Sequence, residues 1–212
     1  MELFPLLPVE RFLALPEEKR KSIIDAGLQV FGKMGYKKAS VSDIAAAAGI
    51  SKAMIFHYFG SKKTMYLYLI QYTFDLIIDA IGSGMDPTVT DFFDRIIQGT
   101  HVKLSVIRRH PALISFATSY YYETDPQVAA ELSAVRAQGD SWRGGFVLTD
   151  VDRGKFKPSV RPELVLSILV RYAEGYVGSM PLTKPEDVDA LLREFTEALT
   201  LMRNNFYKEE FL

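Results

Sequence analysis

The spacing of apolar residues predicts helices along almost the whole of this 212-residue chain. The pattern is clearest in the segment where Val41, Ile44, Ala45 and Ala48 occupy the i, i+3, i+4 and i+7 positions of one helical face. Alternating patterns typical of strands are scarce, and no internal repeat is visible. The pattern therefore predicts an all-α protein.

Proline, glycine and capping residues divide the chain into about nine expected helices. The first begins near Pro16 and ends at Gly35, and two short helices follow on either side of Gly49. Ser61 opens a long helix that runs to about Ile81. Later helices are expected near residues 90–109, from residue 111, from residue 126 to about 145, and at 163–180 and 186–207, with a charged linker at residues 150–162.

The two short helices have recognisable boundaries. Ser40 and Asp43 form an S-x-x-D start, which is similar to a capping box. Gly49 suits the left-handed position that ends a helix, and Ser51 is a good N-cap for the helix of residues 52–59.

A helical wheel of residues 52–59 separates two faces of the second short helix. Ile55, Phe56 and Phe59 cluster on the side expected to face the protein. With Lys52 in the first turn, the outer side carries small and hydrogen-bonding residues that suit a major groove, namely Ala53, Met54, His57 and Tyr58. Alone, this pattern also fits a solvated helical hairpin in a larger bundle.

A more specific indication is the segment GISKAMIFHYFGSKKTMY, which closely resembles the recognition helix and following helix start of TetR-family transcriptional regulators. The resemblance extends to PEEKRKSIIDAGLQVFGKMGYKKASVSDIAAAAG, similar to that family's first helix, and covers roughly residues 16–70. It implies an N-terminal arm and helix-turn-helix DNA-binding domain at residues 1–61. Residues 62–212 would form a helical ligand-binding and dimerisation domain.

The resemblance also implies which residues meet DNA. Lys52, Ala53 and Met54 would contact base edges, and His57 and Tyr58 would contact bases or phosphates. The other implied contacts are at helix starts and go to the DNA backbone: Ser40, Val41, Ser42, Ser51 and Lys62. Two departures stand out, since many members have Gly or Thr at the positions of Ala53 and Met54, and Phe56 replaces a common Tyr.

Charge and composition agree with DNA binding by one end of the chain. The formal net charge is −1, yet residues 1–70 contain ten Lys and Arg against six Asp and Glu, and the rest contain fifteen against twenty. The absence of cysteine excludes disulfides and cysteine metal sites, and the three histidines lack metal-ligand spacing. No cofactor is expected. No apolar run is long enough to span a bilayer, so a cytoplasmic location is expected.

The segment from Met65 to Tyr122 is rich in aromatic residues, which suits either a plain core or a small-molecule site. In the family that this chain resembles, helices of this part enclose a ligand pocket. The candidate ligand-binding residues combine apolar bulk with a hydrogen-bonding edge or neighbour: Tyr72, His101, Phe116, Tyr120 and Trp142.

The last two expected helices have more apolar surface than a single seam requires. A two-fold four-helix interface would bury it, as the resemblance implies, although packing within the chain also accounts for part of it. The candidate dimer residues are Ile168, Tyr172, Tyr176, Leu192, Phe195 and Leu199. Two recognition helices in a homodimer would read a palindromic operator.

These features predict a one-component transcriptional regulator, a repressor released from double-stranded operator DNA by a small hydrophobic or aromatic-compatible effector. Two other classes stay open. The chain would be a helical small-molecule-binding protein if the N-terminal part had lost its DNA function. An all-α enzyme would need acid–base groups, for which His101 and Tyr120 are the only pair available.

Overall fold

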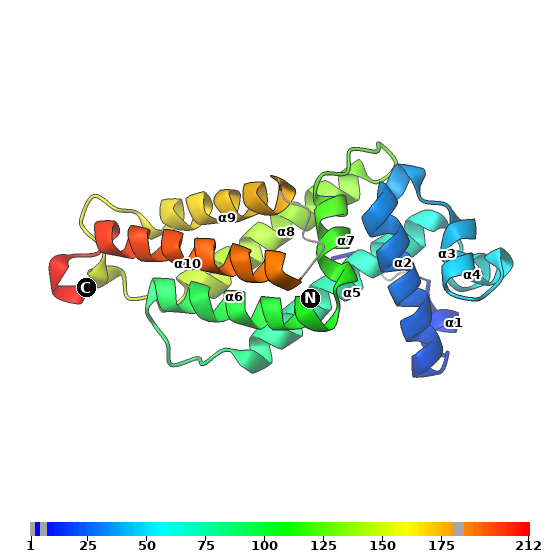
Figure 1. Ribbon diagram of the computed structural model, residues 1–212, viewed down its shortest axis with the longest axis horizontal. Coiled ribbons are helices and arrows are strands. Elements are labelled where there is room, and N and C mark those ends of the chain that lie inside the picture. Colours follow the sequence, from blue (N-terminus) through cyan, green and yellow to red (C-terminus); the bar gives the residue numbers. More distant parts are fainter. Residues whose placement is uncertain (1–2, 5–7, 180–184) are drawn as a thin grey trace. The chain divides into compact units, whose positions relative to one another are not determined.

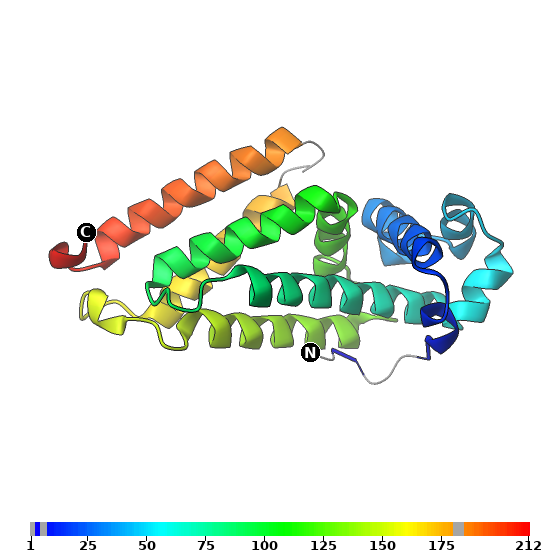
Figure 2. The same ribbon diagram turned by 90° about the horizontal axis from the view of Figure 1, so that it is seen from below.

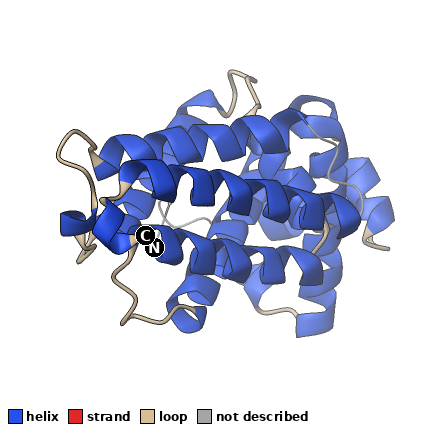
Figure 3. Ribbon diagram, turned by 60° about the vertical axis from the view of Figure 1, so that its left-hand side comes forward, coloured by secondary structure: helices blue, strands red, loops and turns tan. Residues whose placement is uncertain are grey.

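The structure is a computed structural model that describes residues 3–4, 8–179 and 185–212. Within these residues the chain forms α-helices, and its only extended pairing is an isolated bridge between Phe156 and Tyr207 (Figures 1 and 3). The predicted all-α fold is confirmed, and nine of the ten described α-helices have seven or more residues. The junction expected between the last two helices falls at residues 180–184, outside the described residues.

The helices follow one another along the chain in the order α1 (Glu10–Leu13), α2 (Glu17–Lys38), α3 (Val41–Ala47), α4 (Lys52–Phe59), α5 (Lys62–Gly84), α6 (Phe92–Arg109), α7 (Ala112–Tyr121), α8 (Ala129–Leu148), α9 (Pro162–Ser179) and α10 (Pro185–Phe206). Two short 3-10 helices, η1 (Arg153–Lys155) and η2 (Glu209–Phe211), complete the described elements. Helix α1 was not predicted, because only four residues form it.

By packing, the chain divides into two compact units. Unit 1 contains residues 1–78 and 109–138, and unit 2 contains residues 79–108 and 139–212. Helices α5 and α8 contribute residues to both units. The expected division of function at residue 61 stays a prediction.

In unit 1, helix α7 packs closely against helix α2. Gly32 makes this approach possible, because a Cβ atom there would lie 2.7 Å from Ser115 Oγ and 2.9 Å from the backbone nitrogen of Phe116. The Ser119 hydroxyl donates to the carbonyl of Phe31 over 3.0 Å. At the end of α2, the backbone N–H of Tyr36 donates to Glu123 Oε2 over 2.8 Å. The N-terminal part is therefore joined to α7 and to the segment that follows it.

A cluster of aromatic rings fills the core between α2, α5 and α7. Tyr66 lies at its centre, with ring centroids 4.9 Å from Phe31, 4.9 Å from Tyr36 and 5.7 Å from Phe116. The ring of Tyr120 follows 5.6 Å from Phe116. Burial raises the pKa of the Tyr66 phenol far above its usual value, and Glu123, Tyr120 and Tyr36 add to the shift. The cluster gives unit 1 an aromatic core.

The core of unit 2 includes the segment that was expected to be a charged linker. Phe156, in the middle of residues 150–162, is 4% exposed and packs with its ring centroid 4.8 Å from Tyr207. Backbone hydrogen bonds join Lys157 N to Phe206 O and Lys208 N to Lys155 O, each over 2.9 Å. The segment connects α8 to α9 as predicted, but it is not a free linker, because Phe156 anchors it in the core.

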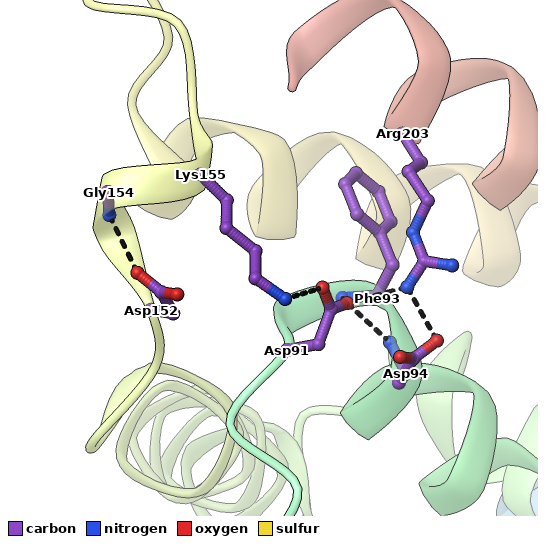
Figure 4. A network of polar contacts seen from close by, with 7 residues as sticks. All are labelled: Asp91, Phe93, Asp94, Asp152, Gly154, Lys155 and Arg203. Carbon is purple, nitrogen blue, oxygen red and sulfur yellow. Dashed lines mark hydrogen bonds and ion pairs between the residues drawn. The ribbon is translucent and has the colours of Figure 1, made fainter. Parts of the chain in front are cut away.

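A network of charged side chains holds this end of unit 2 together (Figure 4). Asp91 caps α6 by accepting hydrogen bonds from the backbone N–H groups of Phe93 and Asp94 over 3.0 and 3.1 Å. Its carboxylate also receives Lys155 Nζ over 2.8 Å and Arg203 Nη2 over 2.6 Å. One carboxylate therefore connects the start of α6 with η1 and the end of α10.

The charge of Asp91 is stabilised in the folded protein. Burial by itself raises the pKa of this carboxyl, but the hydrogen bonds from Lys155, the Asp94 N–H and Arg203 outweigh burial and hold the pKa below its usual value. The Asp91 side chain is 12% exposed. Its contacts with Lys155 and Arg203 are thus shielded from solvent more than an ordinary surface ion pair.

Candidate DNA-binding surface

Helices α3 and α4 form a capped pair, as the sequence predicts. The Ser40 hydroxyl accepts from Asp43 N over 3.1 Å and donates to Asp43 Oδ2 over 2.7 Å. Ser51 Oγ accepts from Met54 N over 3.3 Å. Gly49 lies in the left-handed region with φ of 66°, where glycine is favoured. These local contacts fix where each helix begins and how the chain turns between them.

Buried apolar side chains hold the pair in place. Ile44, Ile55 and Phe59 are fully buried, and Ala45 is 2% exposed. Val41 is also buried, so a DNA contact by this residue would come from its backbone. A recognition helix must be held rigidly to place side chains at base edges, and this packing provides such support.

The opposite face of the pair is open to solvent. Ser42, Ser51, Lys52, Ala53 and His57 are exposed, and Met54 is partly exposed. These side chains are small, cationic or able to form hydrogen bonds. Of the predicted base contacts, the structure places Lys52, Ala53 and Met54 together in the first turn of α4.

The helical wheel was wrong about two residues of α4. Phe56, expected to face the protein, is 41% exposed, and Tyr58, expected to face outward, is 5% exposed. Helix α1 explains the difference, because it packs against α4 (Figure 2). The ring centroid of its Phe12 lies 6.3 Å from that of Tyr58. The Lys52 ammonium lies 6.0 Å from the centre of the exposed Phe56 ring. That Tyr58 contacts DNA stays a prediction.

This exchange of faces predicts that two alanine substitutions lower the stability by unequal amounts. Tyr58→Ala is expected to lower the free energy of unfolding by about 2–4 kcal/mol, because it removes a buried ring. Phe56→Ala is expected to cost less than about 1 kcal/mol, since its ring already contacts water. Urea unfolding followed by circular dichroism measures both. Equal losses, or a larger loss for Phe56→Ala, would contradict the assignment.

Lys62 has a structural role that the sequence did not indicate. Its ammonium donates to the carbonyl oxygens of Tyr36 and Ala39 over 2.9 and 3.2 Å, at the end of α2. It also lies 4.4 Å from the centre of the Tyr36 ring. A cation is favourable there, because the carbonyl end of a helix carries partial negative charge. The predicted phosphate contact of Lys62 stays a prediction.

Arg11 is a candidate that the sequence did not reveal. Helix α1 holds its exposed guanidinium 3.4 Å from Nδ1 of His57, on the open side of α4. Arginine beside a recognition helix suits a phosphate or a base edge. No periodicity marks a single turn of helix in an arm, so only the structure brings Arg11 to this surface.

The predicted ligand-binding residues fall into different environments. Phe116 is fully buried and belongs with Tyr120 to the aromatic core of unit 1. Tyr72, also in unit 1, is partly buried, and burial followed by Asp25 raises the pKa of its phenol. In unit 2, His101 is exposed, whereas the Trp142 ring stacks on Phe146 with centroids 5.2 Å apart. Contact of these five residues with a ligand stays a prediction.

The predicted dimer residues divide in a similar way. Ile168 is 42% exposed, and Tyr172, Tyr176 and Leu192 keep part of their surface. Phe195 and Leu199 are 8% and 1% exposed and belong to the core of unit 2. The alternative of burial within the chain therefore applies to these two residues. The dimer interface itself stays a prediction.

In the part of the chain that the structure describes, no helix is both long enough and apolar enough to span a membrane.

The fold and this surface define a helix-turn-helix protein of the kind that regulates transcription. Residues 23–69 match the model of the bacterial regulatory proteins of the tetR family. The chain is 33% identical over 165 residues to the HTH-type transcriptional regulator RutR of Escherichia coli O157:H7. The aligned stretch covers 77% of this chain and 76% of RutR. The chain belongs to the TetR family, as its motifs predict, and the expectation of a regulator rather than an enzyme is confirmed.

Another curated relative matches over a shorter stretch. The HTH-type transcriptional activator FasR of Mycolicibacterium smegmatis is 28% identical over 116 residues, which is 55% of this chain and 52% of FasR. The chain thus spans about half the length of this relative.

Solved structures share the fold at low sequence identity. A TetR-family regulator from Chloroflexus aurantiacus has a TM-score of 0.73 and 22% identity, over 96% of this chain and all of that one. A putative regulator from Saccharomonospora viridis in complex with choline has a TM-score of 0.65 and 18% identity, over 92% and 100% of the two chains. These similarities extend the family fold to nearly the full chain.

Proposed function

We propose that this protein is a homodimeric, sequence-specific DNA-binding repressor that acts in the cytoplasm and is released from a palindromic operator by a small molecule. The observation that carries the proposal is the open face of α4. Lys52, Ala53 and His57 are exposed there, while Ile55 and Phe59 anchor the helix from behind. This combination suits insertion into a major groove.

Dimerisation follows from the small size of this surface. One eight-residue helix makes few base contacts, so a single copy would bind DNA weakly. Two copies whose recognition helices are one helical turn of DNA apart, about 34–36 Å, or a multiple of it, would read a palindrome together. The exposed side chains of Leu164 and Ile168 on α9 support an interface at the last two helices.

Regulation would use helix α5, which contributes residues to both compact units. A ligand that binds better to one position of this helix shifts the population of DNA-competent dimers. The choline complex of the Saccharomonospora viridis protein supports the view that this fold accommodates a small organic molecule. The aromatic residues of this chain suit a hydrophobic ligand.

Salt-dependent binding to duplex DNA distinguishes the proposed repressor from the alternative, a helical ligand-binding protein without DNA function. We expect the logarithm of affinity to fall linearly with the logarithm of salt concentration, because phosphate contacts release counterions. Fluorescence anisotropy with purified protein and genomic duplexes from its own promoter region provides the measurement. Absence of duplex binding at low salt would favour the alternative.

A further inference from the structure

The buried face of α6 contains one charged residue. Phe92, Ile96, Gly99, Lys103 and Val106 follow one another at intervals of three and four residues, so they share one side of the helix. Phe92, Gly99 and Val106 are buried, and Ile96 packs against the core of unit 2. Lys103 is therefore a cation on a helix face that is otherwise apolar.

Lys103 has no carboxylate partner in the described part of the chain. Burial lowers the pKa of its ammonium to about 8, and the nearby Arg143 guanidinium is the second, smaller cause. None of the hydrogen bonds and ion pairs among the described residues involves this side chain. Part of the Lys103 side chain is nevertheless accessible, a combination expected of a lysine that borders an enclosed space rather than one packed tightly in a core.

The neighbouring charges leave a positive surplus around Lys103. Arg143 on α8 donates to Glu174 Oε1 on α9 over 3.3 Å, and these two side chains are 27% and 23% exposed. The second partner of Arg143 is Asp140, which is 67% exposed and largely solvated. Glu174 offsets one cation, and the charge of Lys103 remains uncompensated.

Unfilled space lies beside Lys103. Gly99, one helical turn earlier, is buried, yet a Cβ atom built on it would meet no side chain or neighbouring element within 4 Å. Side chains of a helix lean toward its N-terminus, so that of Lys103 extends over the turn that contains Gly99. Open space and an unpaired cation thus occur one helical turn apart on the same face of α6.

We propose that the effector is an organic anion with an apolar body, whose carboxylate pairs with Lys103 while its apolar part occupies the space beside Gly99. This inference rests on the proposed function, because it specifies the class of molecule that regulates DNA binding. Phe92 and Ile96 provide apolar surface on the same face of α6. A single anionic group matches the surplus of one positive charge, and a cation such as choline is disfavoured.

Isothermal titration calorimetry on the full chain tests the inference with pairs of ligands that differ only in charge. The acids are octanoate, dodecanoate and phenylbutyrate, and each is compared with its alcohol. We expect the best acid to bind about ten- to a hundredfold more tightly than its alcohol, as a charge-assisted hydrogen bond in a shielded site would give. Choline should show no comparable binding.

The variant Lys103→Met should lose this preference for acid over alcohol. Lys103→Gln provides a second neutral variant in case the first fails to fold, although removal of an unpaired buried charge is expected to be tolerated. Lys33→Met removes an exposed lysine of α2 and should keep the preference.

Equal affinities of acids and alcohols for the wild type would overturn the inference, as would an undiminished preference in both neutral variants. Absence of binding by all three acids would overturn it too. Duplex binding by the wild type is measured separately. A protein that binds DNA but does not distinguish acids from alcohols would contradict this inference and leave the proposed function intact.

Discussion

Replacement of Lys52 by glutamate is expected to abolish specific binding to the operator. Lys52 is exposed in the first turn of α4, beside Ala53 and Met54, where base edges and phosphates are nearest. The substitution removes an attractive contact and places a carboxylate against DNA. We expect a loss of affinity of about a hundredfold for each protomer, and roughly the square of this for a dimer. Fluorescence anisotropy with a labelled operator measures it.

A control must carry the same change of charge elsewhere. Arg161→Glu alters an exposed side chain of unit 2 and should leave operator affinity within about threefold at moderate salt, since distant charges are screened. Both variants should unfold at the same urea concentration as the wild type, because exposed substitutions rarely change stability. If Lys52→Glu retains operator binding, α4 has been wrongly assigned as the recognition helix.

The second large effect is expected at Asp91. Asp91→Ala removes the N-cap of α6 and leaves Lys155 and Arg203 without their shared carboxylate. We expect a loss of about 2–4 kcal/mol in the free energy of unfolding, which is below the value for a fully buried pair because both cations keep some exposure. Asp94→Ala, on the same helix, breaks only the contact of a half-exposed carboxylate with Arg203 and should cost less than about 1 kcal/mol.

The same network predicts how stability depends on pH. The pKa of Asp91 is lower in the folded protein than in the unfolded chain, so its contribution is present above the unfolded pKa and is lost as pH falls through the folded pKa. The difference in stability between the wild type and Asp91→Ala should therefore shrink as the pH falls below about 4. A difference that stays constant down to pH 2 would show that the carboxylate charge is not responsible.

The helix-turn-helix pair could be predicted because its determinants are local. Ser40 and Ser51 cap the helices to which they are adjacent, and Gly49 adopts the left-handed conformation that its position requires. Membership of the TetR family follows from the same short stretch. Caps and turns depend on residues a few positions apart, so a single sequence is enough to identify them.

Contacts between distant segments could not be predicted in this way. Tyr58 is buried because Phe12 of α1 covers it, and no wheel of α4 alone contains that information. Phe116 and Tyr120 are ligand-binding candidates by their apolar bulk and hydrogen-bonding edge, but their place in the aromatic core of unit 1 depends on the packing of α7 on α2, which the sequence does not reveal. Likewise, the position of Lys62 at a helix start does not reveal that its ammonium contacts carbonyl oxygens at the end of α2.

If two copies of α4 read a palindromic operator, selection of bound sequences from a pool of random duplexes will reveal it. We expect enrichment of inverted repeats whose half-site centres are one turn of DNA apart or a multiple of it, and no enrichment with Lys52→Glu. Recovery of unrelated sequences with no shared half-site, or equal enrichment with the variant, would contradict it.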